Sequence, residues 1–275
     1  MKYLIVPNFY APKSPTYQRK YGSEKIHAIS FNQCNFNCAF CGFKQLKKAN
    51  SYYEYSLEEF DRKVERLIPC GLGFKFTGGE PTLNPWLLDS LRCVKKHGGA
   101  VLVDTNGSDY ETIKSACDED LLDVLGVSLK GLTPAEAIRV SGIGRQQLCW
   151  ENVLKSIHYV ANNSKADVIV TYVIDSTTDL SALNKFIELF QAEHSVYFKV
   201  NNFQESKFTI DTGLHPYSSD MVRGALKHIS ECHSDLKGRI IFVDSSKGVR
   251  DTSGIESCKQ KSIAEMKKVP QNLHS

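Results

Sequence analysis

The sequence predicts an α/β fold, because short strand-like runs alternate with helical stretches along most of its 275 residues. The strand-like runs are rich in β-branched and aromatic residues, whereas the stretches between them repeat apolar residues at helical spacing. Six such strands joined by helical crossovers imply a parallel sheet, since parallel neighbours need a long return connection. Right-handed crossovers would curl that sheet, so we expect a partial (β/α)6 TIM-like barrel with a C-terminal extension.

The expected elements alternate from residue 25 onward. The strands are expected at 25–31, 73–77, 100–104, 122–129, 167–173 and 196–200. The helices between them are expected at 57–68, 86–97, 110–117, 152–162 and 180–190. Ser56 followed by Glu59 is a capping-box pattern for the first helix, and Gly98 with Gly99 closes the second. After residue 203 the pattern weakens to one helix, expected at 219–232, and one strand, expected at 239–243.

Composition and charge are those of a soluble globular protein. Hydrophobic residues make up 41% and charged residues 24% of the chain, and the formal net charge is only +3. This small charge gives no support for nucleic-acid or membrane binding, which would need a concentrated basic face. The apolar run at the N-terminus is short and is broken by Pro7, so we expect neither an export signal nor a membrane span, and hence a cytoplasmic location.

The nine cysteines are therefore interpreted as thiols or metal ligands rather than as a disulfide framework. Three of them stand within eight residues, as Cys34-Asn-Phe-Asn-Cys38-Ala-Phe-Cys41, directly after the first expected strand. Three thiolates can hold three corners of a cubane iron–sulfur cluster and leave one iron open for a cofactor or a substrate. A structural zinc site and a chance grouping are the alternatives. Zinc usually takes four ligands, and no second cysteine pair follows downstream.

The cysteine spacing, with Phe40 just before the third cysteine, resembles the signature of the radical S-adenosylmethionine (SAM) superfamily. A second segment, Thr77-Gly78-Gly79-Glu80-Pro81, is similar to the GGE motif of that family, which binds the amino group of SAM. Two glycines let the backbone approach a ligand closely, and Glu80 supplies a carboxylate for the ammonium. The resemblance implies a [4Fe–4S] cluster on the three cysteines and SAM as the source of a 5′-deoxyadenosyl radical.

Two further segments resemble those of the activases of glycyl radical enzymes. Asp104-Thr105-Asn106-Gly107 is similar to their DTNG segment, and Val127-Ser128-Leu129-Lys130 is similar to their DLK segment. By that likeness Lys130 would contact the SAM carboxylate, and Asp104 would lie in a polar or cation site beside the cofactor. Asn202 falls where those activases carry a histidine near the ribose. The implied cofactor-binding residues are Phe40, Thr77, Gly78, Gly79, Glu80, Asp104, Asn106, Ser128, Lys130 and Asn202.

The sequence departs from the activases at three positions. Gly42 stands where they carry a histidine after the third cysteine, Ser128 replaces the aspartate of their DLK segment, and Thr171 replaces an expected arginine. Ferredoxin-like cysteine insertions, common in many activases, are also missing from the sequence. The resemblance covers roughly residues 25–203 and supports the core chemistry, but it does not support glycyl-radical activation.

Each of these segments also has an ordinary structural interpretation. Gly78-Gly79-Glu80-Pro81 and Asn106-Gly107 are typical of turns, Asp104 of a helix cap, and Lys130 of a solvated surface. Phe40 either fills the core or forms a wall against the adenine. The functional interpretation is favoured because the segments follow different expected strands at the same end of the barrel.

We therefore expect a radical SAM enzyme, an oxidoreductase or lyase, that acts on a small molecule or a peptide and takes electrons from a flavodoxin or ferredoxin. The chain divides into an N-terminal extension (1–24), a core barrel (25–203) and a C-terminal extension (204–275) that shapes or caps the substrate site. One alternative is an activase that installs a glycyl radical on a partner enzyme, and another is a non-catalytic zinc-binding interaction protein. Three cysteines have no assigned role: Cys149, Cys232 and Cys258.

Overall fold

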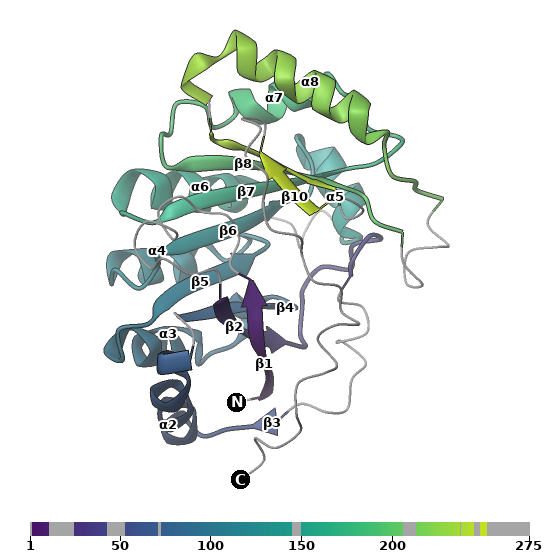
Figure 1. The fold of residues 1–275 in the computed structure, drawn as a ribbon. Helices are drawn as coiled ribbons and strands as arrows, with labels where there is room; N and C mark the ends of the chain where they lie inside the picture. The colour runs from purple at the N-terminus through teal and green to yellow at the C-terminus, as the bar shows by residue number, and fades with distance from the viewer. Residues whose placement is uncertain are drawn as a thin grey trace.

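A computed structural model of the chain contains one continuous sheet with helices packed along it (Figure 1). The structure describes residues 2–10, 25–42, 53–70, 73–144, 150–205, 213–236, 238–244 and 248–251. Within these ranges the sheet has ten strands in the order β10-β9-β8-β7-β6-β5-β4-β2-β1-β3. The seven neighbouring strands from β9 to β2 run parallel to one another.

The elements have the following bounds. The parallel strands are β2 (Lys25–Phe31), β4 (Gly73–Gly78), β5 (Ala100–Thr105), β6 (Val124–Leu129), β7 (Asp167–Ile174), β8 (Val196–Asn202) and β9 (Ile240–Asp244). The antiparallel strands at the two edges are β1 (Lys2–Tyr10), β3 (Tyr53–Glu54) and β10 (Gly248–Asp251). The α-helices are α2 (Leu57–Leu67), α3 (Leu87–Lys96), α4 (Tyr110–Asp118), α5 (Pro134–Ser141), α6 (Trp150–Asn163), α7 (Ala182–Glu188) and α8 (Ser219–Cys232). None of the described helices is long and apolar enough to cross a bilayer.

The expected alternation of parallel strands and helices is confirmed, and the structure adds a seventh parallel strand, a helix and the three antiparallel edge strands. Strand β9 pairs in parallel with β8, so the parallel strands number seven rather than the expected six. Part of the expected C-terminal extension thus continues the barrel, because α8 supplies the crossover that a further parallel strand needs. Helix α5 is the added helix. It is capped at its N-terminus by Thr133, whose hydroxyl accepts from the N–H of Glu136 (3.2 Å), and at its C-terminus by Gly142, which has a φ of 66°.

The inner face of the parallel strands carries one cluster of buried apolar side chains. The cluster includes Ile26 on β2 and Ile241 on β9, although five parallel strands separate these two strands in the sheet. Leu102, Val124 and Ile169 contribute from the strands between them. A cluster that lines the inner face from the first parallel strand to the last is what the curled sheet of a partial barrel requires.

The larger core lies between the outer face of the sheet and the helices (Figure 1). Leu91 on α3, Ile157 on α6 and Phe186 on α7 are fully buried there. Phe76 on β4 and Val170 on β7 pack into the same cluster from the sheet. Each such side chain stabilises the fold by about 1.5–3 kcal/mol when it is fully buried. The helices therefore hold the strands in fixed positions, and the loops at the carboxyl ends of the strands start from fixed points.

The structure describes only some of the cysteines outside the clustered triad. Cys117 is buried and Cys93 is half-buried, and burial raises the pKa of both thiols, that of Cys93 to about 11. Cys232 is exposed on α8. Cys149 and Cys258, to which the sequence analysis assigned no role, lie outside the described residues.

A buried arginine joins β9 to the elements before it. Arg239 directly precedes β9 and is 7% exposed. Its guanidinium donates to the carbonyl oxygens of Val196 (2.9 Å), Glu193 (2.6 Å) and Gln191 (3.3 Å). The carbonyl of Glu193 also accepts from the N–H of Val196 (3.1 Å), whereas a buried carbonyl such as that of Val196 is left unsatisfied when it loses its donor.

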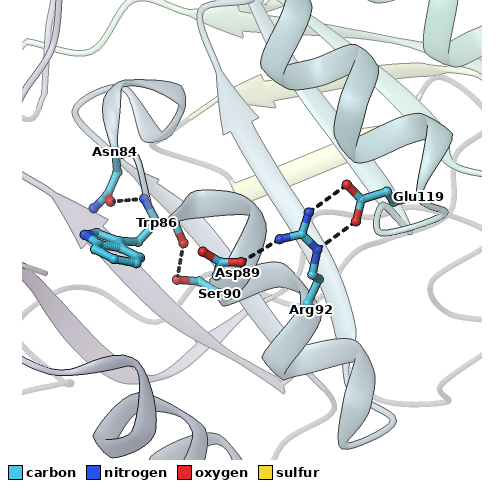
Figure 2. Close-up of polar contacts among 6 residues, drawn as sticks. All are labelled: Asn84, Trp86, Asp89, Ser90, Arg92 and Glu119. Carbon is cyan, nitrogen blue, oxygen red and sulfur yellow. Dashed lines mark hydrogen bonds and ion pairs between the residues drawn. The ribbon is translucent and has the colours of Figure 1, made fainter.

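We expect Arg239→Ala to lower the free energy of unfolding by roughly 2–4 kcal/mol, because it removes three hydrogen bonds, one of them to the carbonyl of the buried Val196. Arg92→Ala is the matched control. Arg92 is an exposed arginine on α3 whose guanidinium contacts Asp89 (2.5 Å) and Glu119 (2.7 Å), as Figure 2 shows. Exposed ion pairs contribute little, so this variant should lose about 1 kcal/mol or less. Denaturant unfolding of both variants measures the difference, and equal losses would contradict the role given to Arg239.

Candidate active site

A cavity of about 260 Å³ lies at the carboxyl ends of the parallel strands, where the loops after β2, β4, β5 and β6 meet. Loops at this end of a (β/α) barrel form its active site. Twelve of the thirteen site residues predicted from the sequence line the cavity: Cys34, Cys38, Phe40, Cys41, Thr77, Gly78, Gly79, Glu80, Asp104, Asn106, Ser128 and Lys130. Six residues that the sequence analysis did not assign to the site line it as well: Phe36, Gly42, Thr105, Thr171, Val173 and Asn201.

The loop after β2 carries the three clustered cysteines, which are thiols and all line the cavity. Cys38 is buried, whereas Cys34 and Cys41 are partly exposed. Backbone hydrogen bonds hold the loop. The N–H of Asn37 donates to the carbonyl of Ser141 at the end of α5 (2.7 Å), and the N–H of Cys41 donates to the carbonyl of Cys38 (3.2 Å). Helix α5, which the sequence analysis did not expect, therefore helps to position the cysteine loop.

Two glycines let the end of β4 approach the cysteine loop. Gly78 has a φ of 98°, and a β-carbon there would lie 2.7 Å from the backbone of Phe31. A β-carbon on Gly79 would lie 1.9 Å from the carbonyl oxygen of Gln33. The N–H groups of Gly79 and Glu80 donate to the carbonyls of Phe31 (2.7 Å) and Gln33 (2.6 Å). The two glycines therefore allow a close approach between the end of β4 and the cysteine loop.

Glu80 is a buried carboxylate that accepts four hydrogen bonds. Its Oε1 accepts from the N–H and the hydroxyl of Thr82 (3.1 and 2.8 Å) and from the hydroxyl of Thr105 (2.6 Å). Its Oε2 accepts from the N–H of Asn106 (2.6 Å). Burial raises the pKa of Glu80 above its ordinary value, and the four donors oppose that shift. Because three of the donors use Oε1, Oε2 retains acceptor capacity for a further donor.

Asn106 connects the turn after β5 to the cysteine loop. Its Nδ2 donates to Oδ1 of Asn35 (2.7 Å), and its Oδ1 accepts from the N–H of Ser108 (3.0 Å). Asn35 in turn donates to the hydroxyl of Ser108 (3.0 Å). Gly107 has a φ of 77°, which agrees with the turn predicted at this dipeptide. Asn106 lines the cavity, but these bonds show that its side chain also fixes the positions of the neighbouring loops.

Asp104 forms an ion pair inside the barrel. One of its oxygens lies 2.5 Å from Nζ of Lys75 and 3.4 Å from the hydroxyl of Thr77. A β-carbon on Gly126, which is in register with Asp104, would lie 2.4 Å from Oδ1 of Asp104. The glycine on β6 therefore makes room for the carboxylate. The sequence analysis predicted a polar or cation site around Asp104, and the cation beside it in the structure is the ammonium of Lys75.

Lys130 and Phe40 meet at the cavity. Nζ of Lys130 lies 5.6 Å from the centre of the Phe40 ring, which is within cation–π range. Phe40 is only partly buried, so it does not fill the core. Ser128, two residues before Lys130 on β6, is in register with Thr171 on β7. These side chains extend the lining of the cavity from the cysteine loop to β7.

Asn202 is the one predicted site residue that does not line the cavity. Its Nδ2 donates to the carbonyl of Tyr217 (2.9 Å), and its Oδ1 accepts from the N–H of Tyr217 (2.8 Å). Asn202 thus ties β8 to the segment before α8, and Asn201 lines the cavity in its place. Neighbouring residues of a strand point to opposite faces, which is why Asn201 lines the cavity and Asn202 does not.

Comparison with known proteins agrees with this geometry. Residues 28–190 match the radical SAM superfamily. A probable GTP 3′,8-cyclase from Thermococcus kodakarensis is 28% identical over 135 residues, which cover 48% of this chain and 44% of that protein. A putative glycyl-radical enzyme activating enzyme from Methanocaldococcus jannaschii is 26% identical over 195 residues, which cover 66% of this chain and 70% of that protein. The structure of SuiB from Streptococcus suis bound to S-adenosylmethionine has a TM-score of 0.61 at 15% identity, over 82% of this chain and 52% of SuiB.

The superfamily match extends over more than half of the chain, so this protein belongs to the radical SAM superfamily. It is therefore an enzyme of a family that implies SAM and a [4Fe–4S] cluster as cofactors. The likeness to SuiB shows the fold, a partial barrel with a parallel sheet. The chain spans about half the length of the GTP 3′,8-cyclases that it matches in Thermococcus kodakarensis and Thermoplasma volcanium.

The residues around the cavity fit these cofactors chemically. Cys34, Cys38 and Cys41 offer three sulfur donors, the ligand type that iron–sulfur clusters take. Glu80 offers an acceptor to a donor such as an ammonium, and the cavity holds both kinds of group. Among the described residues, no three His, Cys, Asp or Glu side chains form a group that would hold a single metal ion. A cubane differs from such a site because it distributes its protein ligands over separate irons.

We expect Gly79→Ala to lower the free energy of unfolding by roughly 1–3 kcal/mol, because the added β-carbon would overlap the backbone of Gln33 and force the two loops apart. Gly224→Ala is the matched control. Gly224 lies inside α8 with open space around a β-carbon, so alanine should keep or raise stability, by up to about 1 kcal/mol. Denaturant unfolding of the cluster-free proteins tests both. A Gly79→Ala variant as stable as wild type would show that the loops do not need this contact.

Proposed function

We propose that this enzyme holds a [4Fe–4S] cluster on Cys34, Cys38 and Cys41 and binds SAM in the same cavity. The observation that carries the proposal is that the three thiols and Glu80 line one cavity, although they lie on separate loops after β2 and β4. When both cofactors are bound and the cluster is reduced, they supply a 5′-deoxyadenosyl radical that takes a hydrogen atom from the substrate. The electron comes from a flavodoxin or ferredoxin.

Several side chains orient SAM in this proposal. Glu80 accepts a hydrogen bond from the SAM ammonium through the remaining capacity of Oε2, and burial strengthens this charged contact. Lys130 pairs with the SAM carboxylate. Phe40, which already lies beside Lys130, provides an apolar surface for the adenine. Thr77 and Ser128 offer hydroxyl groups along the same wall of the cavity.

The proposed substrate is a small molecule. On the side of β7 and β8 the cavity is lined by Thr171, Val173 and Asn201, whose short side chains leave room for a compact group. The two relatives described above differ in substrate type, since the Thermococcus kodakarensis protein is named for GTP and the Methanocaldococcus jannaschii protein for a glycyl radical enzyme. A peptide substrate is the alternative within the same chemistry. Membership of an enzyme superfamily argues against the non-catalytic zinc-binding alternative.

Activation of a partner protein is the second candidate function. The observation in its favour is the match to 70% of a putative glycyl-radical enzyme activating enzyme. Gly42, Ser128 and Thr171 line the cavity at positions where the activases carry other residues, and these differences count against it. A glycyl radical signal in electron paramagnetic resonance, after incubation with a glycyl radical enzyme encoded nearby, would identify this function.

The central test is reductive cleavage of SAM. We expect protein reconstituted anaerobically with iron and sulfide, and reduced with dithionite, to release 5′-deoxyadenosine that mass spectrometry detects. Cys38→Ala should release none, because it removes one of the three proposed cluster ligands. Cys232→Ala is the matched control, since this cysteine is exposed on α8, outside the lining of the cavity, and should retain the wild-type yield. Bound zinc in place of iron, with no product from wild-type protein, would contradict the proposal.

Glu80→Gln should weaken SAM binding by about tenfold or more, because it removes the charge that attracts the ammonium. Glu188→Gln, an exposed change on α7, should bind SAM like wild type. Wild-type affinity should also fall as the pH is lowered, since protonation removes the carboxylate. Burial raises the pKa of Glu80, so this fall begins at a higher pH than for an ordinary glutamate. Titration calorimetry at several pH values, with unreduced protein, measures this. A glutamine variant with wild-type affinity would refute the role of Glu80.

A further inference from the structure

A second charged group faces the interior of the barrel on β8. Tyr197, Lys199 and Asn201 alternate along this strand, so their side chains share one face of the sheet. Tyr197 belongs to the inner apolar cluster, and Asn201 lines the cavity. Lys199 lies between them and therefore also faces the interior, next to the cavity but not among the residues that line it. It is in register with Thr171 on β7, which lines the cavity as well.

The interior at this level carries more positive than negative charge. The charges that act on Lys199 are those of Lys75 on β4 and Asp104 on β5. The carboxylate of Asp104 is already paired with Lys75 at 2.5 Å. Among the described residues, no carboxylate lies within ion-pair distance of Lys199. Two ammonium groups thus share one carboxylate, and a half-buried cation is left without a counter-charge of its own.

A polar atom beside Lys199 also has no partner. Oδ1 of Asn201 is buried, and it makes no hydrogen bond within the described part of the chain. Buried polar groups are nearly always hydrogen-bonded, so an unpaired oxygen that lines a cavity is available to accept from a bound molecule. An unpaired ammonium and an unpaired amide on neighbouring positions of one face are suited to a ligand with an anionic group and a hydrogen-bond donor.

We propose that Lys199, supported by Lys75 and Asn201, binds an anionic group of the substrate, a carboxylate or a phosphate, in the interior of the barrel. The inference rests on the proposed function, because it assumes that this cavity is where the substrate meets the radical. The anion pairs with Nζ of Lys199 and neutralises the excess charge, while Asn201 accepts from a donor on the same molecule. Burial and the neighbouring Lys75 lower the pKa of Lys199 to about 8, so an anion that pairs with it also stabilises its charged form.

The substrate is the expected occupant because the SAM contacts proposed above use other strands. Glu80 follows β4, and Lys130 follows β6, whereas Lys199 and Asn201 lie on β8. The β8 side of the cavity is therefore available to a second molecule that carries its own negative charge. A substrate without an anionic group would leave Lys199 with no counter-charge in the barrel.

Protection of Lys199 from acetylation tests the inference without a known substrate. Reconstituted, SAM-saturated wild-type protein is treated at pH 8 with a limiting amount of acetic anhydride, and mass spectrometry compares Lys199 with the exposed Lys185. The probes are inorganic phosphate and acetate, each against sodium chloride at equal ionic strength. At about 20 mM of an anion whose Kd is about 10 mM, acetylation of Lys199 should slow by about threefold. Lys185 should be unaffected.

Each outcome decides the proposal. Protection by phosphate alone identifies a phosphate site, and protection by acetate alone identifies a carboxylate site. Lys75→Gln should abolish protection, because Asp104 is then released to pair with Lys199, whereas Lys185→Gln should retain it. The inference would be overturned if neither anion protected Lys199. It would also be overturned if SAM alone, compared with SAM-free protein, protected Lys199 fully. The yield of 5′-deoxyadenosine from the same preparations tests the proposed function separately, so product without protection refutes only the anion site.

Discussion

Glu80 connects the ends of β4 and β5 through its carboxylate, and it connects them to the cysteine loop through its backbone N–H. The side chain accepts hydrogen bonds from Thr105 at the end of β5 and from Asn106 directly after it, and the backbone N–H of Glu80 donates to the carbonyl of Gln33 in the cysteine loop. Withdrawing a carboxylate from water costs several kcal/mol unless donors replace the water, and four donors do so here. Gly79 permits the contact because any side chain would overlap Gln33. The relative positions of the thiols and of Glu80 therefore follow from one buried anion and its compensation.

Much of the fold was predictable from the sequence, because periodicity and helix caps are local signals. The capping box of Ser56 and Glu59 is present, and α8 has the predicted bounds. Helix α5 had local signals as well, since Thr133-Pro134 with Glu136 and a later Gly142 form a typical start and stop. The place of the seventh parallel strand in the sheet, by contrast, was not predictable from local signals. The pattern at 239–243 predicted a strand, but its partner depends on contacts across the sheet, such as those of Arg239, that no local pattern contains.

The candidate site likewise contains residues that local motifs identify and residues whose role depends on contacts between strands. Motifs identified twelve residues that line the cavity, since each motif is a short segment with its own spacing. Asn202 lies outside the lining of the cavity and Asn201 within it, because neighbouring residues of a strand take opposite faces and a loose resemblance does not specify the face. The ion pair of Lys75 with Asp104 joins β4 to β5, and no spacing within either strand predicts it. Lys199 was missed for the same reason, since its significance depends on charges on other strands.

The two sides of the cavity differ in how far the protein itself satisfies their polar groups. On the side of β4 and β5, Glu80 and Asn106 are bonded to the chain, so their positions are set before any ligand arrives. On the side of β8, Lys199 and Oδ1 of Asn201 have no partner among the described residues. Preorganised groups orient a cofactor that every turnover uses, whereas unpaired groups regain their lost hydration only when a matching molecule binds. This asymmetry favours a fixed SAM site on one side and selection of an anionic substrate on the other.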